Sequence, residues 1–578
     1  MSRLQPRSKA ISTSNVSPQS AVSTVASSAT GSNSAATSKD IASGPQTPVS
    51  RPGNRPSTVD PVSDRSTLFL IRRTLCSHLV DKGRSTPLPI ENILPPLTSS
   101  NGVDLQLYAF IAIIIREFVH TWYTKITPDP MFVEEVVKII AHCTRALEQR
   151  IRNVDLQSVL FDELPDLLDV HLKVHRTAHY KLHPSPLEVS PRTIYHSLWP
   201  MTCLSPVPDD DGGPLSQQQM NNEAVYRQML VQGVLAVLLP TEDLENDCLT
   251  TLVGQIFSEM IIGGAVGGKA AEPWLLWEVI TKVAEVVQNQ LPRSKAKVRL
   301  ERSHSDVGRM SPFDATTQMS KAGRLKWHAQ KTFWLVLQYI FLAWTALRFL
   351  FNTITTASSL PPRSSARKES TKDSSHSTDH LTPNKSNIET LPIGEDLELK
   401  KPIIKMKVWS FVDSLLDLSF RMPWLSGTIS MLQWAALTGF GEVGNTDGIL
   451  DKILSHAIDT HVLDPSQLPS VLRNARAALF PNNAPAPPRV IPSPAEQLLI
   501  RKKCAETILS LIPAKIQDIY FGGGREKRVA EVEEVLNMFD DPYCNKHLLY
   551  GIVELLIVRL MPELAEKGVE ELFEERLS

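Results

Sequence analysis

Long stretches of apolar residues with helical spacing set the main limits on what this 578-residue chain can fold into. From Asp104 to Tyr123, apolar residues recur every three or four positions, as they do on the buried face of an α-helix. Similar segments follow as far as residue 291 and again from residue 403. A half-buried β-strand needs strict alternation of apolar and polar residues, and this alternation is scarce. We therefore predict an all-α protein.

Changes in composition divide the chain further. Residues 1–65 are rich in Ser, Thr and Pro and contain no aromatic residue, so we expect a disordered tail. The helical patterns predict two folded units, at residues 66–291 and 403–572. Between them we expect a basic linker at 292–331, an apolar helix at 332–354 and a second disordered linker at 355–402.

Charge and cysteine content exclude several classes of protein. The formal net charge of −2 does not indicate a nucleic-acid-binding protein, which would carry a basic surface. The six cysteines are widely spaced and form no C-x-x-C motif, which argues against a disulfide scaffold and a cysteine-based zinc site. We expect reduced thiols in a protein that faces the cytosol. The N-terminus shows no apolar core of a secretory signal.

Two motifs resemble sites of known chemistry. Gly263–Lys269 satisfies the G-x4-G-K part of a phosphate-binding loop, but the preceding strand is missing and Ala270 replaces the magnesium-binding hydroxyl. We therefore expect a tight glycine turn between helices. His171, His175 and His179 would share one helix face and could bind zinc. The outer pair would lie about 12 Å apart along the axis, so we expect a solvated polar face instead.

No catalytic constellation emerges from the sequence. The chain contains no G-x-S-x-G, no H-E-x-x-H and no dinucleotide-binding fingerprint. We expect neither an enzyme nor a bound cofactor or metal.

The most apolar stretch runs from Thr332 to Phe351 and is about as long as a bilayer core is thick. It could span a membrane, lie in the membrane interface or a lipid groove, or serve as a core helix. We favour the interface or groove, because a single span would place the two helical units on opposite sides of a membrane. Basic residues beside an apolar helix also attract anionic lipid. The residues expected to contact acyl chains are Phe333, Trp334, Leu337, Phe341 and Trp344. Those expected to contact anionic headgroups are Lys295, Lys297, Arg299, Lys326 and Lys331.

Several spaced segments resemble a known family. The Leu94–Leu97 loop, the helix ending Glu117–Val119 and the Ile126–Asp129 break resemble the opening of the PX-associated (PXA) domain. The resemblance continues at Asn222–Arg227 and at Pro273-Trp274. In the second unit, the segments similar to a sorting nexin C-terminal domain are Val412–Leu418, Leu479–Asn482, Asn545–Tyr550 and Leu560–Leu564.

This resemblance implies a fungal-type PXA and sorting nexin protein whose two terminal domains fold against each other around a lipid-accommodating groove. It implies a non-enzymatic role in organelle contact, lipid transfer or endosomal and vacuolar trafficking. The expected partners are phospholipid membranes or a bound lipid and trafficking or contact-site proteins, and the expected location is the endoplasmic reticulum, endosome or vacuole. Alternatives are a scaffold that binds no lipid and a single-pass tether. We recognise no PX domain, no RGS domain and no N-terminal anchor.

Overall fold

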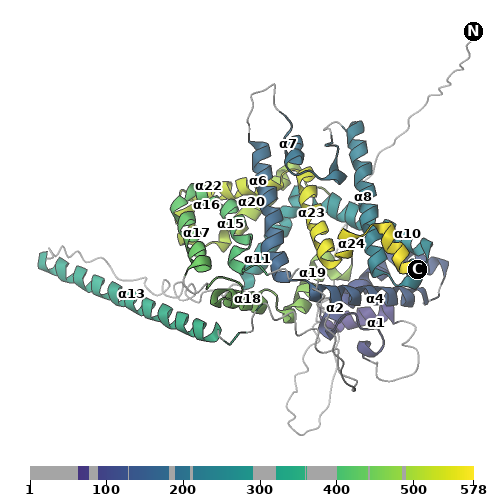
Figure 1. The fold of residues 1–578 in the computed structure, drawn as a ribbon, viewed down its shortest axis with the longest axis horizontal. Helices are drawn as coiled ribbons and strands as arrows, with labels where there is room; N and C mark the ends of the chain where they lie inside the picture. Colours follow the sequence, from purple (N-terminus) through teal and green to yellow (C-terminus); the bar gives the residue numbers. More distant parts are fainter. Residues whose placement is uncertain are drawn as a thin grey trace, which may run out of the picture. The chain divides into compact units, whose positions relative to one another are not determined.

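A computed structural model describes residues 63–76, 89–127, 129, 131–180, 189–208, 212–290, 321–357, 359–360, 363, 400–439, 443–484 and 490–578. Within these ranges the secondary structure is helical and contains no strand, which confirms the predicted all-α class (Figure 1). The predicted disordered tail at 1–65 lies outside the described residues except for its last three positions. Residues 292–320 of the basic linker and 364–399 of the second linker also lie outside the described residues.

The N-terminal half consists of helices between residues 64 and 290. Most of them match the predicted segments, and several contain π-helical turns. They are α1 (Asp64–Leu75), η1 (Ile90–Asn92), α2 (Asn101–Ile114), η2 (Ile115–Val119), α3 (His120–Ile126), α4 (Met131–Asn153), α5 (Leu156–Ser158), η3 (Val159–Glu163), α6 (Leu164–His179), α7 (Pro191–Leu198), η4 (Thr202–Leu204), α8 (Pro214–Leu238), α9 (Thr241–Leu244), α10 (Asp247–Gln255), η5 (Ile256–Ala270) and α11 (Pro273–Gln290).

The C-terminal half follows the long helix α13 (Lys321–Ala357). Its helices are η6 (Ile403–Lys405), α15 (Val408–Leu416), α16 (Leu418–Arg421), α17 (Pro423–Thr438), α18 (Ile449–His461), η7 (Pro465–Gln467), α19 (Leu468–Leu479), η8 (Pro481–Asn483), α20 (Pro494–Leu511), α21 (Ala514–Tyr520), α22 (Arg525–Leu536), η9 (Asn537–Phe539), α23 (Pro542–Leu560), α24 (Glu563–Glu566) and α25 (Val569–Leu577).

Side-chain caps fix where several helices begin. The Asp155 carboxylate accepts hydrogen bonds from the amides of Gln157 and Ser158 at the start of α5. Ser493 and Glu496 form a reciprocal capping box at the start of α20. Such caps satisfy amides that have no partner inside the helix.

The two halves share their hydrophobic cores. Trp274 and Trp277 of α11 pack with buried residues of α20 and α22, including Cys504 and Val532. Helix α19 lies against α2, and Phe480 joins the core formed by α1, α2 and α4. Helices α15 and α23 both contact α6. The described parts of residues 63–290 and 400–578 therefore form one packed body, not two independent domains.

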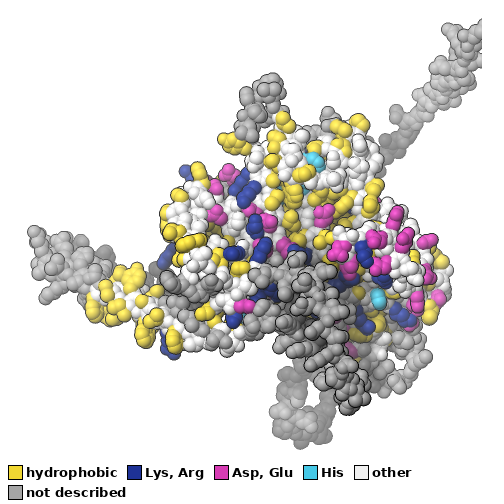
Figure 2. All heavy atoms as spheres, in the orientation of Figure 1, with side chains coloured by type: hydrophobic (Ala, Val, Ile, Leu, Met, Phe, Trp, Pro, Cys, Tyr) yellow, Lys and Arg dark blue, Asp and Glu magenta, His cyan; other side chains and the backbone are white. Residues whose placement is uncertain are grey.

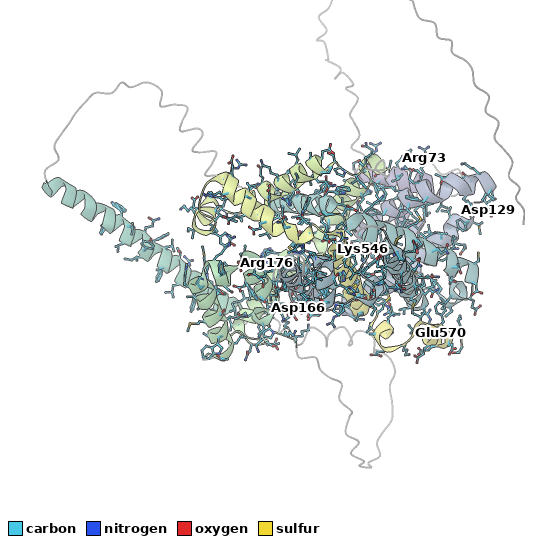
Figure 3. The ribbon with its side chains drawn as sticks, turned by 90° about the horizontal axis from the view of Figure 1, so that it is seen from above. Arg73, Asp129, Asp166, Arg176, Lys546 and Glu570 are labelled. Carbon is cyan, nitrogen blue, oxygen red and sulfur yellow. The ribbon has the colours of Figure 1, made fainter. Side chains whose placement is uncertain are left out.

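Polar contacts between the halves follow the same pattern. The guanidinium of Arg476 is fully buried and donates to the Thr67 hydroxyl of α1. Arg176 of α6 donates to the Ser414 carbonyl of α15, and Lys407 lies 3.3 Å from Asp166 of α6. Arg176 and Asp166 are labelled in Figure 3. These contacts join residues more than 230 positions apart, so they depend on the folded chain rather than on local sequence.

The predicted glycine turn at 263–268 is wrong, because these glycines lie inside the π-helical segment η5. A Cβ atom on Gly267 would come 2.4 Å from the Tyr550 hydroxyl oxygen and 3.2 Å from Glu223 Oε1. One on Gly263 would come 2.9 Å from Arg227 Nε. The glycines therefore allow helices to approach closely, and the sequence alone could not distinguish that use from a turn.

The segment 184–214 is rich in proline, a composition typical of a loop. It contains the two-turn helix α7, which begins at Pro191. A proline at the first helical position starts a helix as readily as it interrupts one. Helix α7 brings Tyr195, which is fully buried, into contact with α6 and α23.

Candidate functional site

The five residues predicted to contact acyl chains all lie on α13 and are all exposed. Phe333, Trp334, Leu337, Phe341 and Trp344 have exposed fractions between 46 and 69%. At about 100° per residue, they lie within roughly 100° of one another around the helix axis. The exposure contradicts the alternative of a core helix.

Helix α13 is apolar on its other sides as well. Leu335, Tyr339 and Leu342 point away from that first face by helical geometry and are each more than half exposed. A helix that is hydrophobic all round is normally buried in protein or in lipid. Figure 2 shows hydrophobic side chains along the described part of α13.

The five basic residues predicted to contact headgroups lie at the start of α13 or before it in the chain. Lys326 and Lys331 lie in α13, in its first three turns, and their side chains are not described. Lys295, Lys297 and Arg299 lie outside the described residues. Their role stays a prediction.

Helices α16 and α17 form a second apolar surface that the sequence analysis missed. No residue of either helix is buried, and α17 contains no charged side chain. Phe420, Trp424, Met431 and Trp434 are each at least 66% exposed. Figure 2 shows hydrophobic side chains at the surface where α16 and α17 lie. The absence of charge over sixteen residues was the available signal.

The described part of the chain contains one helical segment that is long and apolar enough to cross a membrane, and it is Asp247–Ala270 rather than α13. Within α13, the apolar stretch found is Phe333–Thr345, which is shorter than the roughly 20 residues of a spanning helix. Asp247–Ala270 is nevertheless packed along one side against α8 and α23. Its outer side exposes Leu252, Phe257 and Met260.

The prediction of a solvated histidine face is wrong for two of the three histidines. His171 and His175 are buried, whereas His179 is exposed. His171 Nε2 lies 2.9 Å from the Met538 carbonyl and Nδ1 lies 2.8 Å from the Tyr195 hydroxyl. Because a carbonyl can only accept, Nε2 carries the proton and Nδ1 accepts from tyrosine. Burial lowers the pKa of His171 to about 4, so the ring is neutral.

This arrangement does not resemble a metal site. Among the residues that the structure describes, no group of three or more His, Cys, Asp or Glu side chains could hold a metal ion. His171 serves to join the halves, because its two partners come from α7 and η9. His547 of α23 lies beside them and contacts Tyr195 edge-on. Burial lowers the pKa of His547 to about 4 as well.

A buried ionic network joins α8, η5 and α23. The Glu223 carboxylate lies 3.1 Å from Lys546 Nζ and 3.1 Å from Arg227 Nη1, and it accepts a 2.6 Å hydrogen bond from the Tyr550 hydroxyl. Burial raises the pKa of Glu223, but Lys546 and the hydrogen bonds outweigh this effect and lower it overall. The network joins the two halves, because Glu223 and Arg227 come from α8 whereas Lys546, labelled in Figure 3, and Tyr550 come from α23.

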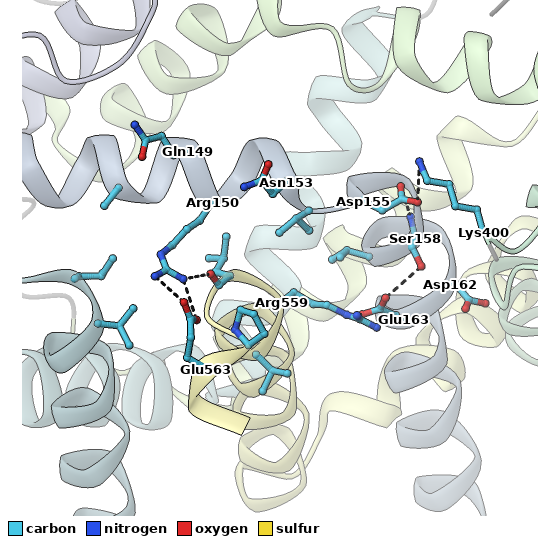
Figure 4. A pocket seen from close by; sticks show the side chains of 18 of the residues that line it. Gln149, Arg150, Asn153, Asp155, Ser158, Asp162, Glu163, Lys400, Arg559 and Glu563 are labelled. Carbon is cyan, nitrogen blue, oxygen red and sulfur yellow. Dashed lines mark hydrogen bonds and ion pairs between the residues drawn. The ribbon is translucent and has the colours of Figure 1, made fainter. Parts of the chain in front are cut away.

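A cavity of about 1000 Å³ opens between α4, η3 and the end of α23 (Figure 4). The charged side chains that line it come from both halves and from the segment that connects them. The cations are Arg150, Arg363, Lys400, Lys401, Arg559 and Arg576, and the carboxylates are Asp155, Asp162, Glu163 and Glu563.

Comparison with known proteins agrees with the resemblance seen in the sequence. Residues 100–283 match the PXA domain family. PXA domain protein 1 of Schizosaccharomyces pombe is 28% identical over 142 residues, which are 24% of this chain and 26% of that protein. Human sorting nexin-25 is 24% identical over 171 residues, 30% of this chain and 19% of that protein. An uncharacterized protein of Saccharomyces cerevisiae is 22% identical over 474 residues, 79% of each chain.

No solved structure matches the chain. The matches confirm the predicted resemblance to PXA domain proteins and sorting nexins, and one fungal relative covers most of the chain. The matched part spans only about a quarter of the S. pombe protein and a fifth of sorting nexin-25. The likeness of residues 403–572 to a sorting nexin C-terminal domain stays a prediction, because the family match lies at 100–283.

Proposed function

We propose that this protein is a non-enzymatic, membrane-associated lipid-binding protein that acts in sorting-nexin-like trafficking. Its PXA match and its sorting nexin relatives support the trafficking role. The observation that carries lipid binding is α13, whose apolar side chains from Phe333 to Trp344 are exposed on all sides. Burial of such side chains in acyl chains would remove a large apolar area from water.

Helices α16 and α17 extend this argument. They add exposed aromatic side chains, including Trp424 and Trp434, to those of α13. Apolar patches of this extent are unusual on soluble monomers and mark contacts with membranes, ligands or proteins. Tryptophan is favoured where a membrane meets water, because its ring is apolar and its N–H is polar. We therefore infer that more than one helix faces lipid.

Flotation of the full chain with phosphatidylcholine and phosphatidylserine vesicles tests this proposal. The variant Phe333→Ser, Leu337→Ser, Phe341→Ser removes apolar surface from α13. These three side chains are exposed and belong to none of the hydrophobic cores described above, so the fold should be kept. Each buried side chain of this size contributes about 1.5–3 kcal/mol, so the variant is expected to bind vesicles at least about tenfold more weakly.

A matched control replaces three equally exposed apolar residues elsewhere, as Leu479→Ser, Val490→Ser, Ile491→Ser. It is expected to float like the native protein. If both triple variants float alike, α13 is not the lipid-binding element. If the native protein does not float but retains its protein partners, the scaffold alternative holds instead.

The electrostatic part has its own test. Replacement of Lys295, Lys297, Arg299, Lys326 and Lys331 by Glu should abolish flotation with anionic vesicles, because each basic residue near an anionic surface contributes about 1 kcal/mol. Unchanged flotation would refute this part while leaving the apolar contact in place. Action at contacts between organelles, and location at the endoplasmic reticulum, an endosome or a vacuole, are proposed from the resemblance alone.

A further inference from the structure

We propose that the charged cavity between α4, η3 and α23 binds a phosphate-bearing anion. This site is separate from the apolar surface of α13 and does not depend on the proposed function. The argument rests on which charges in the cavity are already neutralised and which hydrogen-bond donors have no acceptor.

Three of the four lining carboxylates are held by a cation at hydrogen-bond distance. Arg150 pairs with Glu563 at 2.9 Å, Arg559 with Glu163 at 2.7 Å and Lys401 with Asp162 at 2.7 Å. The first two of these pairs are labelled in Figure 4. They account for three cations and three carboxylates, so they contribute no net charge.

Among the lining residues that the structure describes, the remaining cations outnumber the remaining carboxylates. They are Arg363, Lys400 and Arg576, and the fourth lining carboxylate is Asp155. Arg576 donates to three main-chain carbonyls at the end of α8, which leaves its charge uncompensated. Asp451 lies 3.7 Å from Arg363 Nη1. Arg363 and Lys400 therefore face two carboxylates, Asp155 and Asp451, and the one excess positive charge among the described lining residues is that of Arg576. A partly enclosed cavity concentrates such a field and favours an anion.

Arg363 supplies the second observation. Its side chain is 4% exposed, and only Nη1 makes a hydrogen bond, to the Lys401 carbonyl. Nε and Nη2 are buried and have no hydrogen-bond partner in the described structure. The Asp155 carboxylate lies 3.9 Å from Nη2, beyond hydrogen-bond distance. Buried donors without acceptors are destabilising and rare, so we infer that a bound ligand accepts hydrogen bonds from Nε and Nη2 of Arg363.

The free edge of Arg363 also specifies the chemistry. Nε and Nη2 lie side by side on one edge of the planar guanidinium, and two parallel N–H bonds from one edge match two oxygens of a phosphate group. Lys400 Nζ lies 3.6 Å from Asp155 Oδ2, the oxygen that also faces Arg363 Nη2, so this carboxylate offsets one of the two charges and an anion at Arg363 must bind beside it.

The rest of the cavity suits a polar ligand larger than phosphate alone. Gln149 and Asn153 line it and make no hydrogen bond among the described residues, so both amides can meet hydroxyl or ester oxygens (Figure 4). A volume of about 1000 Å³ lies at the upper end of ligand cavities, enough for a glycerophosphate or inositol phosphate group. The phosphate could belong to a lipid headgroup or to a soluble metabolite.

Calorimetric titration of the full chain distinguishes these sources. The probes are glycerol 3-phosphate and the short-chain lipid dihexanoyl phosphatidic acid, which share a phosphate monoester. The native protein is expected to bind at least one of them. Arg363→Gln should weaken that binding at least about tenfold through loss of a bidentate charged contact, and Lys400→Gln should weaken it by a smaller factor. Lys515→Gln, an exposed substitution on α21, is the matched control and should change nothing.

Each outcome has a definite meaning. Tighter binding of the lipid than of glycerol 3-phosphate, weakened by Arg363→Gln, identifies a headgroup. Equal affinities, again weakened by Arg363→Gln, identify a soluble phosphate ester. If neither probe binds, the proposal is overturned. It is also overturned if Arg363→Gln and Lys400→Gln both fold and bind the probes as tightly as the native protein does. Vesicle flotation that depends on α13 would survive that result, so the two proposals fail separately. Since Lys400 is only half-buried, its variant keeps the test valid if Arg363→Gln does not fold.

Discussion

Gly267 of η5 lies close to Glu223 of α8 and Tyr550 of α23. Replacement by alanine places a Cβ atom 2.4 Å from the Tyr550 hydroxyl oxygen, so the buried ionic network must shift. We expect Gly267→Ala to lower the free energy of unfolding by about 1–3 kcal/mol, as overpacking of a core does. Urea unfolding measures this change.

Gly427 provides the control, because it is exposed in α17 and a Cβ atom there meets nothing within 4 Å. Gly427→Ala should leave the stability unchanged or raise it by up to about 1 kcal/mol, since alanine favours helix. Equal effects of the two substitutions would contradict the close approach at Gly267.

The buried histidines predict how stability depends on pH. Burial lowers the pKa values of His171 and His547 to about 4, whereas a histidine in the unfolded chain titrates near 6.5. Between pH 6.5 and 4 the unfolded chain therefore binds more protons than the folded chain. The free energy of unfolding should fall as the pH falls through this window, with each histidine contributing up to about 1.4 kcal/mol per pH unit.

His171→Gln isolates one contribution. Between pH 6.5 and 5, its unfolding free energy should change less with pH than that of the native protein. His461→Gln removes an exposed histidine and should keep the native dependence. An unaltered slope in His171→Gln would show that His171 does not stay neutral in the fold.

At the scale of elements, helices α16 and α17 combine regular structure with almost no burial. Trp424 and Trp434 are each about two-thirds exposed. Substitutions at such exposed positions usually change stability by less than about 0.5 kcal/mol. We therefore expect Trp424→Ser, Trp434→Ser to fold normally and to bind vesicles more weakly. Trp277→Ser, in the core shared by α11 and α20, should cost about 3–5 kcal/mol. Loss of stability in the first variant would show that α17 packs against protein instead.

The helices themselves were largely predictable, because apolar spacing and prolines mark them locally. The helical pattern from Asp104 to Tyr123 lies within the consecutive helices α2, η2 and α3, which run from Asn101 to Ile126. The environment of each helix was not predictable in the same way. The spacing of His171 and His175 is compatible with either a solvated or a buried face, and the tertiary contacts with Tyr195 and Met538 decide between them. The cavity joins Arg150, Arg363 and Arg559, which no local pattern connects.

At the scale of the whole molecule, the two halves complete each other's cores. Trp274 and Trp277 of the N-terminal half are buried against α20 and α22 of the C-terminal half. Residues 63–290 expressed alone should therefore expose these side chains and aggregate or unfold without cooperativity. Co-expression with residues 400–578 should restore a soluble one-to-one complex, which size-exclusion chromatography with light scattering would detect. Cooperative unfolding of residues 63–290 alone would contradict the shared core.

The shared core also bears on membrane attachment. Because the halves pack together, a spanning α13 between them would have to return the chain to the same side of the bilayer. A helix that lies in the interface avoids this problem, and its tryptophans should enter the outer acyl region. This insertion is the central claim of the proposed function.

Quenching of tryptophan fluorescence by brominated phospholipids measures the insertion directly. Vesicles of brominated phosphatidylcholine with phosphatidylserine should quench the native protein more than the variant Trp334→Phe, Trp344→Phe, which keeps the apolar character of α13 and should still bind. The difference between the two reports Trp334 and Trp344 alone. Equal quenching of the two proteins, with both bound to the vesicles, would show that α13 does not enter the bilayer and would contradict the account.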